Sequence, residues 1–179
     1  EDGIRDVAVT GVQTCALPIF QRRYIYLARY IMAYDYKQGF FKPTNPKKYR
    51  GDAENIVYRS GWEKKVMNWC DTNKSVVSWS SEEVVIPYMS PIDNRVHRYF
   101  VDFYVEAIDN NGNKQTYLLE VKPKAQTQEP KFQKRKTKKY ITEVMTWGVN
   151  EAKWKAAQEY CKDHGWQFKL ITEADLFKM

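Results

Sequence analysis

Three residues with side chains able to act on a phosphate group lie in two strand-like runs. Asp102 lies within "YFVDF", and Glu120 and Lys122 lie within "LLEVKPK". Carboxylates bind hard divalent cations, and a lysine stabilises negative charge that develops on a phosphate. Aromatic and β-branched neighbours predict strands for both runs, where such polar groups are unusual as plain core. The three residues are therefore candidates for a catalytic site.

The segment "DNNGN" between the two runs predicts a β-hairpin. If the hairpin turns at Asn111, Asp102 faces Glu120 with Cβ atoms about 5 Å apart. Lys122 then shares their face, because side chains alternate along a strand, and a slip of one residue would separate them. The opposite face is expected to form core and consists of Val101, Phe103, Leu119 and Val121.

Two opposed carboxylates repel each other unless positive charge lies between them. A divalent cation such as Mg²⁺ or Mn²⁺ would supply that charge. A purely structural alternative has Asp102 and Glu120 paired with basic side chains on a solvated sheet face. The candidates for that pairing are Arg98, Lys114 and Lys122.

The elements around these strands are predicted from periodicity. "RSGWEKKVMNWCD" has helical spacing with Ser60 at the N-cap, and "SVVSWSSEEVVIPY" contains two short strands. "HRYFVDFYVEAI" predicts one long strand. "YITEVMTWGVNEAKWKAAQEYCKDHG" predicts two helical pieces that meet near Gly148 and stop at Gly165, before a strand in "WQFKLIT" and a helical turn in "EADLF". This order predicts an α/β domain with a mixed sheet flanked by helices.

Composition limits the class of protein. The 179 residues are 15% aromatic and 28% charged, which is typical of a globular domain, and no apolar run reaches the roughly 20 residues of a membrane span. Cys15, Cys70 and Cys161 are too widely spaced to indicate a zinc site or a disulfide framework. The formal charge of +7 favours a polyanionic partner.

The arrangement of Asp102 followed by Glu120-Val-Lys122 resembles the core of the PD-(D/E)xK nucleases, which have the restriction-endonuclease-like fold. The resemblance implies that Asp102, Glu120 and the Val121 carbonyl hold the metal ion and that Lys122 stabilises charge or positions water. Val101 stands where the motif usually has proline.

Glu63, in "YRSGWEKK", stands where many of these nucleases have a helical glutamate. The resemblance implies that it contributes to the metal site, through a second metal ion or a bridging water. The alternative is a capping box, in which Glu63 accepts a hydrogen bond from the Ser60 amide.

Longer stretches resemble the head-completion proteins of T-even-type tailed phages, from about residue 36 to 177. They are "YKQGFFKPTNPKKYRGD", "YRSGWEKKVMNW", "SSEEVVIPYMSPIDNRVHRYFVDF", "EVKPKAQTQEP" and "NEAKWKAAQEYCKDHGWQFKLIT". That family shares its nuclease-like core with the N-terminal domain of the transposition endonuclease TnsA. The resemblance implies action on packaged DNA ends, contact with portal or neck proteins, and a place in the virion or the host cytoplasm, without a membrane.

Three functions fit this resemblance. The first is a metal-dependent DNA endonuclease that trims packaged ends, which intact Asp102, Glu120 and Lys122 favour. The second is a structural virion protein that locks or plugs the portal with a silent nuclease fold. The third, a host repair or transposition nuclease, lacks a visible partner-binding extension.

The segment after Glu120 is strongly basic and is expected to bind DNA phosphates. It carries eight positive residues against Glu129, of which Lys122 belongs to the candidate site. No base-reading motif is apparent, so we expect recognition of shape or ends. The expected DNA-binding residues are Lys124, Lys131, Lys134, Arg135, Lys136, Lys138 and Lys139.

The N-terminal part predicts three divisions of the chain. "GVQTCALPI" resembles translated sequencing-adapter sequence, so residues 1–31 are expected to be non-native and Met32 to be the true start. The alternatives are a short arm with a helix over 21–33, or a signal peptide, for which the arginines follow the apolar stretch in the wrong order. Residues 32–51 are expected to form an extended basic arm without regular structure, and residues 52–179 a nuclease-like domain.

Overall fold

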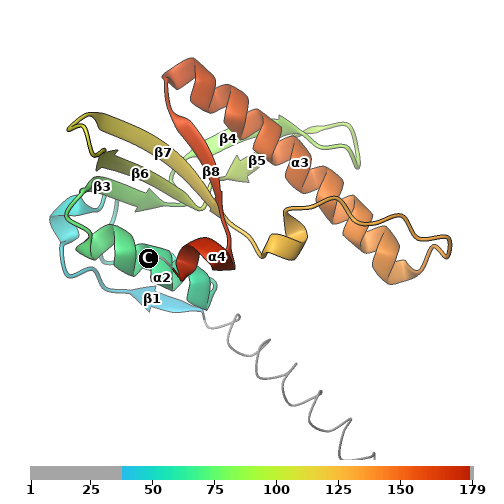
Figure 1. The fold of residues 1–179 in the computed structure, drawn as a ribbon, viewed down its shortest axis with the longest axis horizontal. Coiled ribbons are helices and arrows are strands. Elements are labelled where there is room, and N and C mark those ends of the chain that lie inside the picture. The colour runs from blue at the N-terminus through green and yellow to red at the C-terminus, as the bar shows by residue number, and fades with distance from the viewer. Residues whose placement is uncertain (1–37, 178–179) are drawn as a thin grey trace, which may run out of the picture. The chain divides into compact units, whose positions relative to one another are not determined.

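A four-stranded mixed sheet is the centre of the computed structural model, which describes residues 38–177 (Figure 1). Its strand order is β3 (Val76–Ser81), β6 (Phe103–Ile108), β7 (Lys114–Val121) and β8 (Gln167–Ile171). Strand β6 is antiparallel to both of its neighbours, β3 and β7, and β8 runs parallel to β7. The predicted mixed sheet is confirmed.

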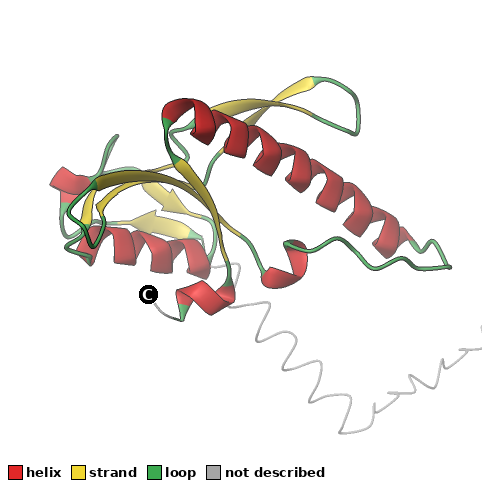
Figure 2. Cartoon of the chain, turned by 45° about the horizontal axis from the view of Figure 1, so that its top comes forward, coloured by secondary structure: helices red, strands yellow, loops and turns green. Residues whose placement is uncertain are grey.

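Helices cover both faces of this sheet (Figures 1 and 2). Helix α2 (Gly61–Thr72) and the short α4 (Glu173–Leu176) lie on one face, and α3 (Lys138–His164) lies on the other. The predicted α/β architecture, a mixed sheet flanked by helices, is therefore confirmed. None of the described helices is long and apolar enough to cross a membrane.

The β6–β7 hairpin has the register expected from a turn at Asn111. Phe103 pairs with Leu119, and Ile108 pairs with Lys114. Because side chains alternate, Phe103 and Leu119 pack against α2, whereas Tyr104 and Leu118 pack on the side of α3. The same register brings Asp102 beside Glu120.

The run from 96 to 108 does not form one strand, as the sequence suggested. Strand β5 (Val96–Phe100) pairs with β4 (Val85–Met89) in a separate two-stranded sheet, and β6 begins at Phe103. Val101 donates its amide hydrogen to the Val84 carbonyl and packs with the α3-side core, so its predicted place beside Phe103 is wrong. The chain changes pairing partner here, and Asp102 occupies the junction.

Helix α3 runs unbroken through Gly148, so the predicted division into two pieces is wrong. A single helical glycine costs about 1 kcal/mol relative to alanine, which is too little to end a helix anchored elsewhere. Trp154, Ala157 and Cys161 provide that anchor in its buried second half. Gly165 ends the helix in the left-handed conformation, with φ of 68°, as predicted.

Residues 38–51 have regular structure, contrary to the expected extended arm. Strand β1 (Gly39–Phe41) pairs with β2 (Ile56–Tyr58), and η1 (Pro46–Lys48) follows β1. The Thr44 amide donates to buried Asp71 at 2.7 Å, which ties the segment to α2. The predicted non-native segment and the start of the arm lie outside the described residues, and their boundaries stay predictions.

Candidate active site

The structure brings Asp102, Glu120 and Lys122 together at the end of the β6–β7 hairpin. The Val121 amide donates a hydrogen bond of 2.8 Å to Oδ2 of Asp102, which fixes that carboxylate beside strand β7. Lys122 Nζ lies 3.0 Å from Oε1 of Glu120. The junction between β5 and β6 thus delivers an acid to the strand that carries the second acid and the lysine.

Glu120 is buried, with 4% of its surface exposed. The hydroxyl of Tyr99 donates a hydrogen bond of 2.7 Å to its Oε2 atom. The alternative of a solvated sheet face is therefore wrong for Glu120. Tyr99 was not among the residues predicted for the site, because its approach depends on the change of strand partner between β5 and β6.

The electrostatics of the three charged groups are linked. Burial raises the pKa of Asp102, and the neighbouring charge of Glu120 raises it further, against the opposing effects of Lys122 and the Val121 amide. Burial lowers the pKa of Lys122, but the charges of Glu120 and Asp102 outweigh it and raise that pKa. One ammonium group thus serves two carboxyl groups, and the site has net negative charge once both of them are ionised.

This donor set suits a hard divalent cation. Two carboxylates served by a single lysine are the ligand type that Mg²⁺ and Mn²⁺ prefer. Within residues 38–177, no group of three or more His, Cys, Asp and Glu side chains is placed to hold a metal ion. A cation between Asp102 and Glu120 would need further ligands from backbone carbonyls and water, as Mg²⁺ commonly takes.

Comparison with known proteins agrees with this arrangement. The family of TnsA-like endonuclease N-terminal domains matches residues 73–173. The head completion nuclease of Enterobacteria phage T4 is 40% identical over 149 residues, which cover 81% of this chain and 95% of that protein. The chain belongs to the head completion nuclease family. The family and the nuclease core predicted from the sequence are confirmed.

In this member of the head completion nuclease family, the TnsA-like match includes three of the four predicted catalytic residues. Asp102, Glu120 and Lys122 fall within residues 73–173, whereas Glu63 precedes them. The matched region contains the four strands of the central sheet and helix α3. The shared core therefore supplies the two acids and the lysine, and the fourth predicted residue comes from helix α2.

Glu63 lies in the first turn of α2 and is held by capping contacts. Its amide donates to Oγ of Ser60 at 3.1 Å, and its Oε1 accepts from the same hydroxyl at 2.9 Å. Its Oε2 accepts from the Arg59 amide at 2.7 Å, so the expected bond from the Ser60 amide is replaced by one from the preceding residue. The Glu63 charge also contributes to the raised pKa of Asp102, which puts it near the site. Its metal-binding role stays a prediction.

Arg59 and Glu82 form a second link, between the residue before the N-cap of α2 and the Asp102 junction, which the sequence did not indicate. The Arg59 guanidinium donates two hydrogen bonds of 2.9 Å to the Glu82 carboxylate. The Glu82 amide donates to the carbonyl of Asp102 at 3.2 Å. Glu82 has a φ of 56°, a strained conformation for this residue type, and the two contacts hold it there.

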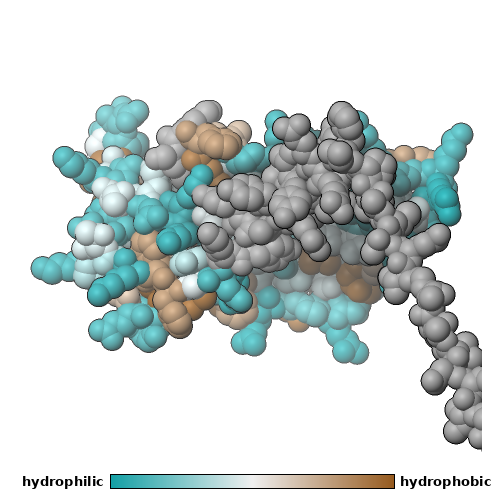
Figure 3. Space-filling view, turned by 90° about the horizontal axis from the view of Figure 1, so that it is seen from below, coloured by the Kyte–Doolittle hydropathy of each residue, from teal (hydrophilic) through white to brown (hydrophobic). Residues whose placement is uncertain are grey.

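The predicted DNA-binding residues follow β7 in one exposed segment. Lys124 lies in η2 (Lys124–Gln126), and its backbone amide donates a hydrogen bond of 2.8 Å to Oε2 of Glu173. Lys138 and Lys139 are the first two residues of α3. Figure 3 shows mostly hydrophilic residues at the end of the molecule that carries this segment. All seven residues are exposed: Lys124, Lys131, Lys134, Arg135, Lys136, Lys138 and Lys139.

Proposed function

We propose that this protein is a metal-dependent DNA endonuclease that acts on the ends of packaged phage DNA during head completion. The observation that carries the proposal is the grouping of two acids, Asp102 and Glu120, beside the single ammonium of Lys122. The name of the T4 relative, head completion nuclease, supports the same activity and stage of assembly. The substrate would be double-stranded DNA, met in the virion or the host cytoplasm, with portal or neck proteins as further partners.

Asp102, Glu120 and the Val121 carbonyl would hold Mg²⁺ or Mn²⁺. The bound ion would polarise the scissile phosphate and lower the pKa of a water molecule to yield the nucleophile. Glu63 would be the third acid of the site and would contribute through a bridging water, because its own carboxylate is engaged by Ser60 and Arg59.

The protein's own groups have separate tasks in this reaction. Lys122 keeps its proton because the two carboxylates raise its pKa, so it would present a positive charge to the developing charge on the phosphate. Tyr99 fixes Glu120 by its hydrogen bond, and the Val121 amide fixes Asp102. These bonds orient both acids before the substrate arrives, which lowers the cost of reorganisation.

The basic segment would capture the DNA backbone. Its charges lie directly after Lys122 in the chain and are exposed to solvent. Each lysine or arginine that meets a phosphate releases a counterion, which gives salt-dependent binding without sequence preference. The proposed activity thus divides into phosphate capture by the segment and phosphodiester hydrolysis at the strand ends.

The test is cleavage of linear duplex DNA by the purified protein. We expect nicking or degradation with Mg²⁺ or Mn²⁺ and none with EDTA. Asp102→Asn and Lys122→Ala should each abolish cleavage but largely retain DNA binding. Lys114→Ala is the matched control for Lys122→Ala, because Lys114 also lies 3.0 Å from a glutamate oxygen, on Glu106.

One outcome would reject the endonuclease. If wild type and Asp102→Asn are equally inert with every metal and DNA end but both bind DNA, the fold is catalytically silent. The protein would then be assigned to the structural role of locking or plugging the portal.

A further inference from the structure

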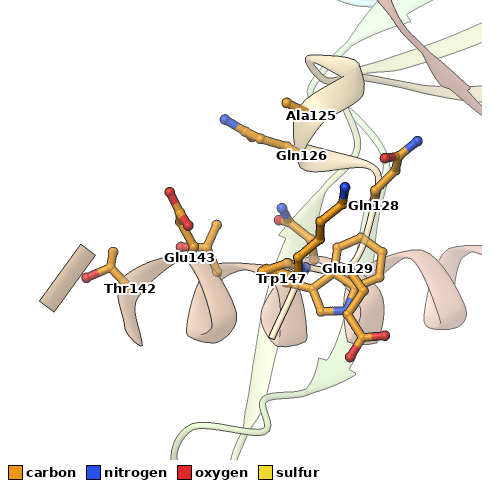
Figure 4. Close-up of a pocket in the computed structure, with 11 residues that line it drawn as sticks. Ala125, Gln126, Gln128, Glu129, Thr142, Glu143 and Trp147 are labelled. Atoms are coloured by element: carbon orange, nitrogen blue, oxygen red, sulfur yellow. The ribbon is translucent and has the colours of Figure 1, made fainter. Parts of the chain in front are cut away.

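A pocket of about 510 Å³ lies between the basic segment and the first half of helix α3. Figure 4 shows its two walls, with Gln126 and Gln128 from the segment and Glu143 and Trp147 from the helix. The volume is in the range of small-molecule sites, and the lining combines one large aromatic ring with several amide groups. Such a lining fits a flat, polar-edged ligand.

Asn150 provides an amide group that a ligand in the pocket could meet. It lines the pocket from α3 and is 8% exposed. Its carboxamide forms no hydrogen bond within residues 38–177 and is not one of the fully buried unpaired polar groups of that region, which are the Nε1 atoms of Trp79 and Trp154, so the amide is open to a ligand in the pocket. A ligand with donors and acceptors on its edge would satisfy this group.

Trp147 supplies an oriented aromatic surface. Its ring meets that of Trp154 edge to face, with centroids 5.7 Å apart and planes at 77°. Trp154 is buried, so this contact holds the half-buried Trp147 ring in place at the pocket. A preset indole favours stacking with another planar ring, which stabilises single-stranded nucleic acid binding by about 1–3 kcal/mol per base.

The charges in the lining distinguish a base from a phosphate. Glu129 and Glu143 both line the pocket, against Lys131. Two carboxylates repel a phosphate but accept hydrogen bonds from the amino groups of bases, as they do from cytosine in DNA grooves. The pocket is therefore suited to a nucleobase, whereas the surrounding lysines are suited to its backbone.

The pocket is close to the candidate site along the chain. Its lining begins at Ala125, three residues after Lys122. Consecutive Cα atoms are 3.8 Å apart, so the Cα atoms of these two residues are separated by at most about 11 Å. This bound applies to Ala125, the first residue of the lining, and corresponds to about three stacked nucleotides along one strand.

We propose that this pocket, with the Trp147 ring and the Asn150 amide, binds an unpaired nucleobase near the cleaved phosphate. The inference rests on the proposed nuclease function and specifies its substrate as duplex DNA with an unpaired nucleotide at or near its end. A fully paired base cannot enter the pocket, because the base must first leave the helical stack.

Binding in EDTA tests the proposal with three DNA probes of the same duplex sequence. One has a blunt end, the second has a short single-stranded overhang, and the third has the same overhang with abasic sugars. We expect wild type to bind the normal overhang more tightly than the other two. Trp147→Leu should reduce the ratio of normal to abasic overhang affinity about tenfold, and Trp147→Phe should retain most of it.

A second pair of variants keeps the test decisive if Trp147→Leu does not fold. Gln128 lines the pocket, whereas Gln133 is an exposed glutamine of the same segment outside the lining. Gln128→Ala should reduce the preference for the normal over the abasic overhang about threefold, and Gln133→Ala should leave it unchanged.

The proposal is wrong if wild type binds all three probes equally, or if the pocket variants weaken binding of all three probes alike. The pocket would then be free for another ligand, such as a side chain of a partner protein.

Cleavage of the blunt duplex with Mn²⁺ separates this inference from the proposed function. Cleavage without a preference for unpaired bases would reject the base pocket alone. A preference for unpaired bases without cleavage would support the pocket and reject the nuclease.

Discussion

Two acidic regions beside the same β6–β7 hairpin differ in how their charge is balanced. Glu106, in the middle of β6, accepts a hydrogen bond of 2.6 Å from Ser78. It also lies 3.0 Å from Lys114 and 3.7 Å from Arg50. Burial raises the pKa of Glu106, but the hydrogen bonds from Ser78 and Lys114 outweigh it and lower that pKa.

The pair of acids at the open end of the hairpin has the opposite balance. Asp102 and Glu120 share Lys122, and the pKa of Asp102 is raised. Two cations serve one acid at Glu106, whereas one cation serves two acids here. The comparison indicates that an acid is structural when neighbouring cations lower its pKa, and is a candidate metal ligand when acids outnumber cations and its pKa is raised.

The largest expected effect separates the two regions by activity. Asp102→Asn should reduce metal-dependent DNA cleavage at least about a thousandfold, since a ligand of the proposed cation is removed and metal stabilisation amounts to several kcal/mol. Glu106→Gln removes a carboxylate on β6, the strand that follows Asp102, but outside the candidate site. It should leave cleavage within about threefold of wild type. Equal losses in both variants, measured on linear duplex DNA, would remove the distinction between the regions.

The next effect concerns capture of DNA by the basic segment. Reversing the charges of Lys134, Arg135 and Lys136 should weaken duplex binding and lower the slope of log K against log salt by about one for each phosphate that the protein no longer neutralises. Asp102→Asn should retain the wild-type slope. Binding titrations over a range of salt concentrations measure this, and an unchanged slope in the triple variant would mean that the segment does not bind phosphates.

Removal of the Tyr99 hydroxyl tests the support given to Glu120. Tyr99→Phe should reduce cleavage about tenfold at limiting metal concentration, because a hydrogen bond to a charged group contributes about 1.5–3 kcal/mol. Part of the activity should return at saturating Mn²⁺. Tyr88→Phe, on the neighbouring strand, is the control. A Tyr99→Phe enzyme with wild-type metal dependence would show that the hydroxyl does not position Glu120 for the ion.

The smallest effect is on stability without metal. Because the pKa of Asp102 is raised in the folded state, the stability it contributes is present at low pH and disappears as the pH rises through that pKa. In EDTA, Asp102→Asn should therefore gain about 2–4 °C in Tm over wild type at alkaline pH, with a smaller gain at acidic pH.

Glu106 should change stability with pH in the opposite direction. Its pKa is lowered in the folded state, so its charge stabilises the fold at pH values above its unfolded-state pKa. That stabilisation disappears as the pH falls through its folded-state pKa. Melting curves of Glu106→Gln in EDTA should show a lower Tm than wild type at neutral pH, with a difference that narrows in acid. Parallel pH profiles for the two variants would contradict the difference in charge balance.

The sequence predicted the features that depend on local pattern. The expected turn at Asn111 and the alternation of side chains predicted the register in which Phe103 pairs with Leu119. That register in turn predicted that Asp102 and Glu120 lie close together. Ser60 as N-cap and Gly165 as the end of α3 follow from backbone chemistry that few other residues supply.

The features that sequence reasoning missed depend on interactions between distant segments. The break at Asp102 arises because β5 pairs with β4 and not with the central sheet, and Tyr99 reaches Glu120 only as a result. The hydrogen bond from Thr44 to Asp71 likewise gave no local signal in a segment rich in proline and lysine. Tertiary packing overrode the local preference in each case.

Metal binding to the purified protein tests the central claim most directly, without any assumption about the DNA substrate. At alkaline pH, saturating Mn²⁺ or Mg²⁺ should raise the Tm of wild type by several degrees, because a ligand at a hundred times its Kd stabilises the fold by about 2.7 kcal/mol. Glu106→Gln should show the same shift and Asp102→Asn should show almost none. A shift in Asp102→Asn equal to that of wild type, or no shift in wild type, would contradict the claim that Asp102 and Glu120 hold a divalent cation.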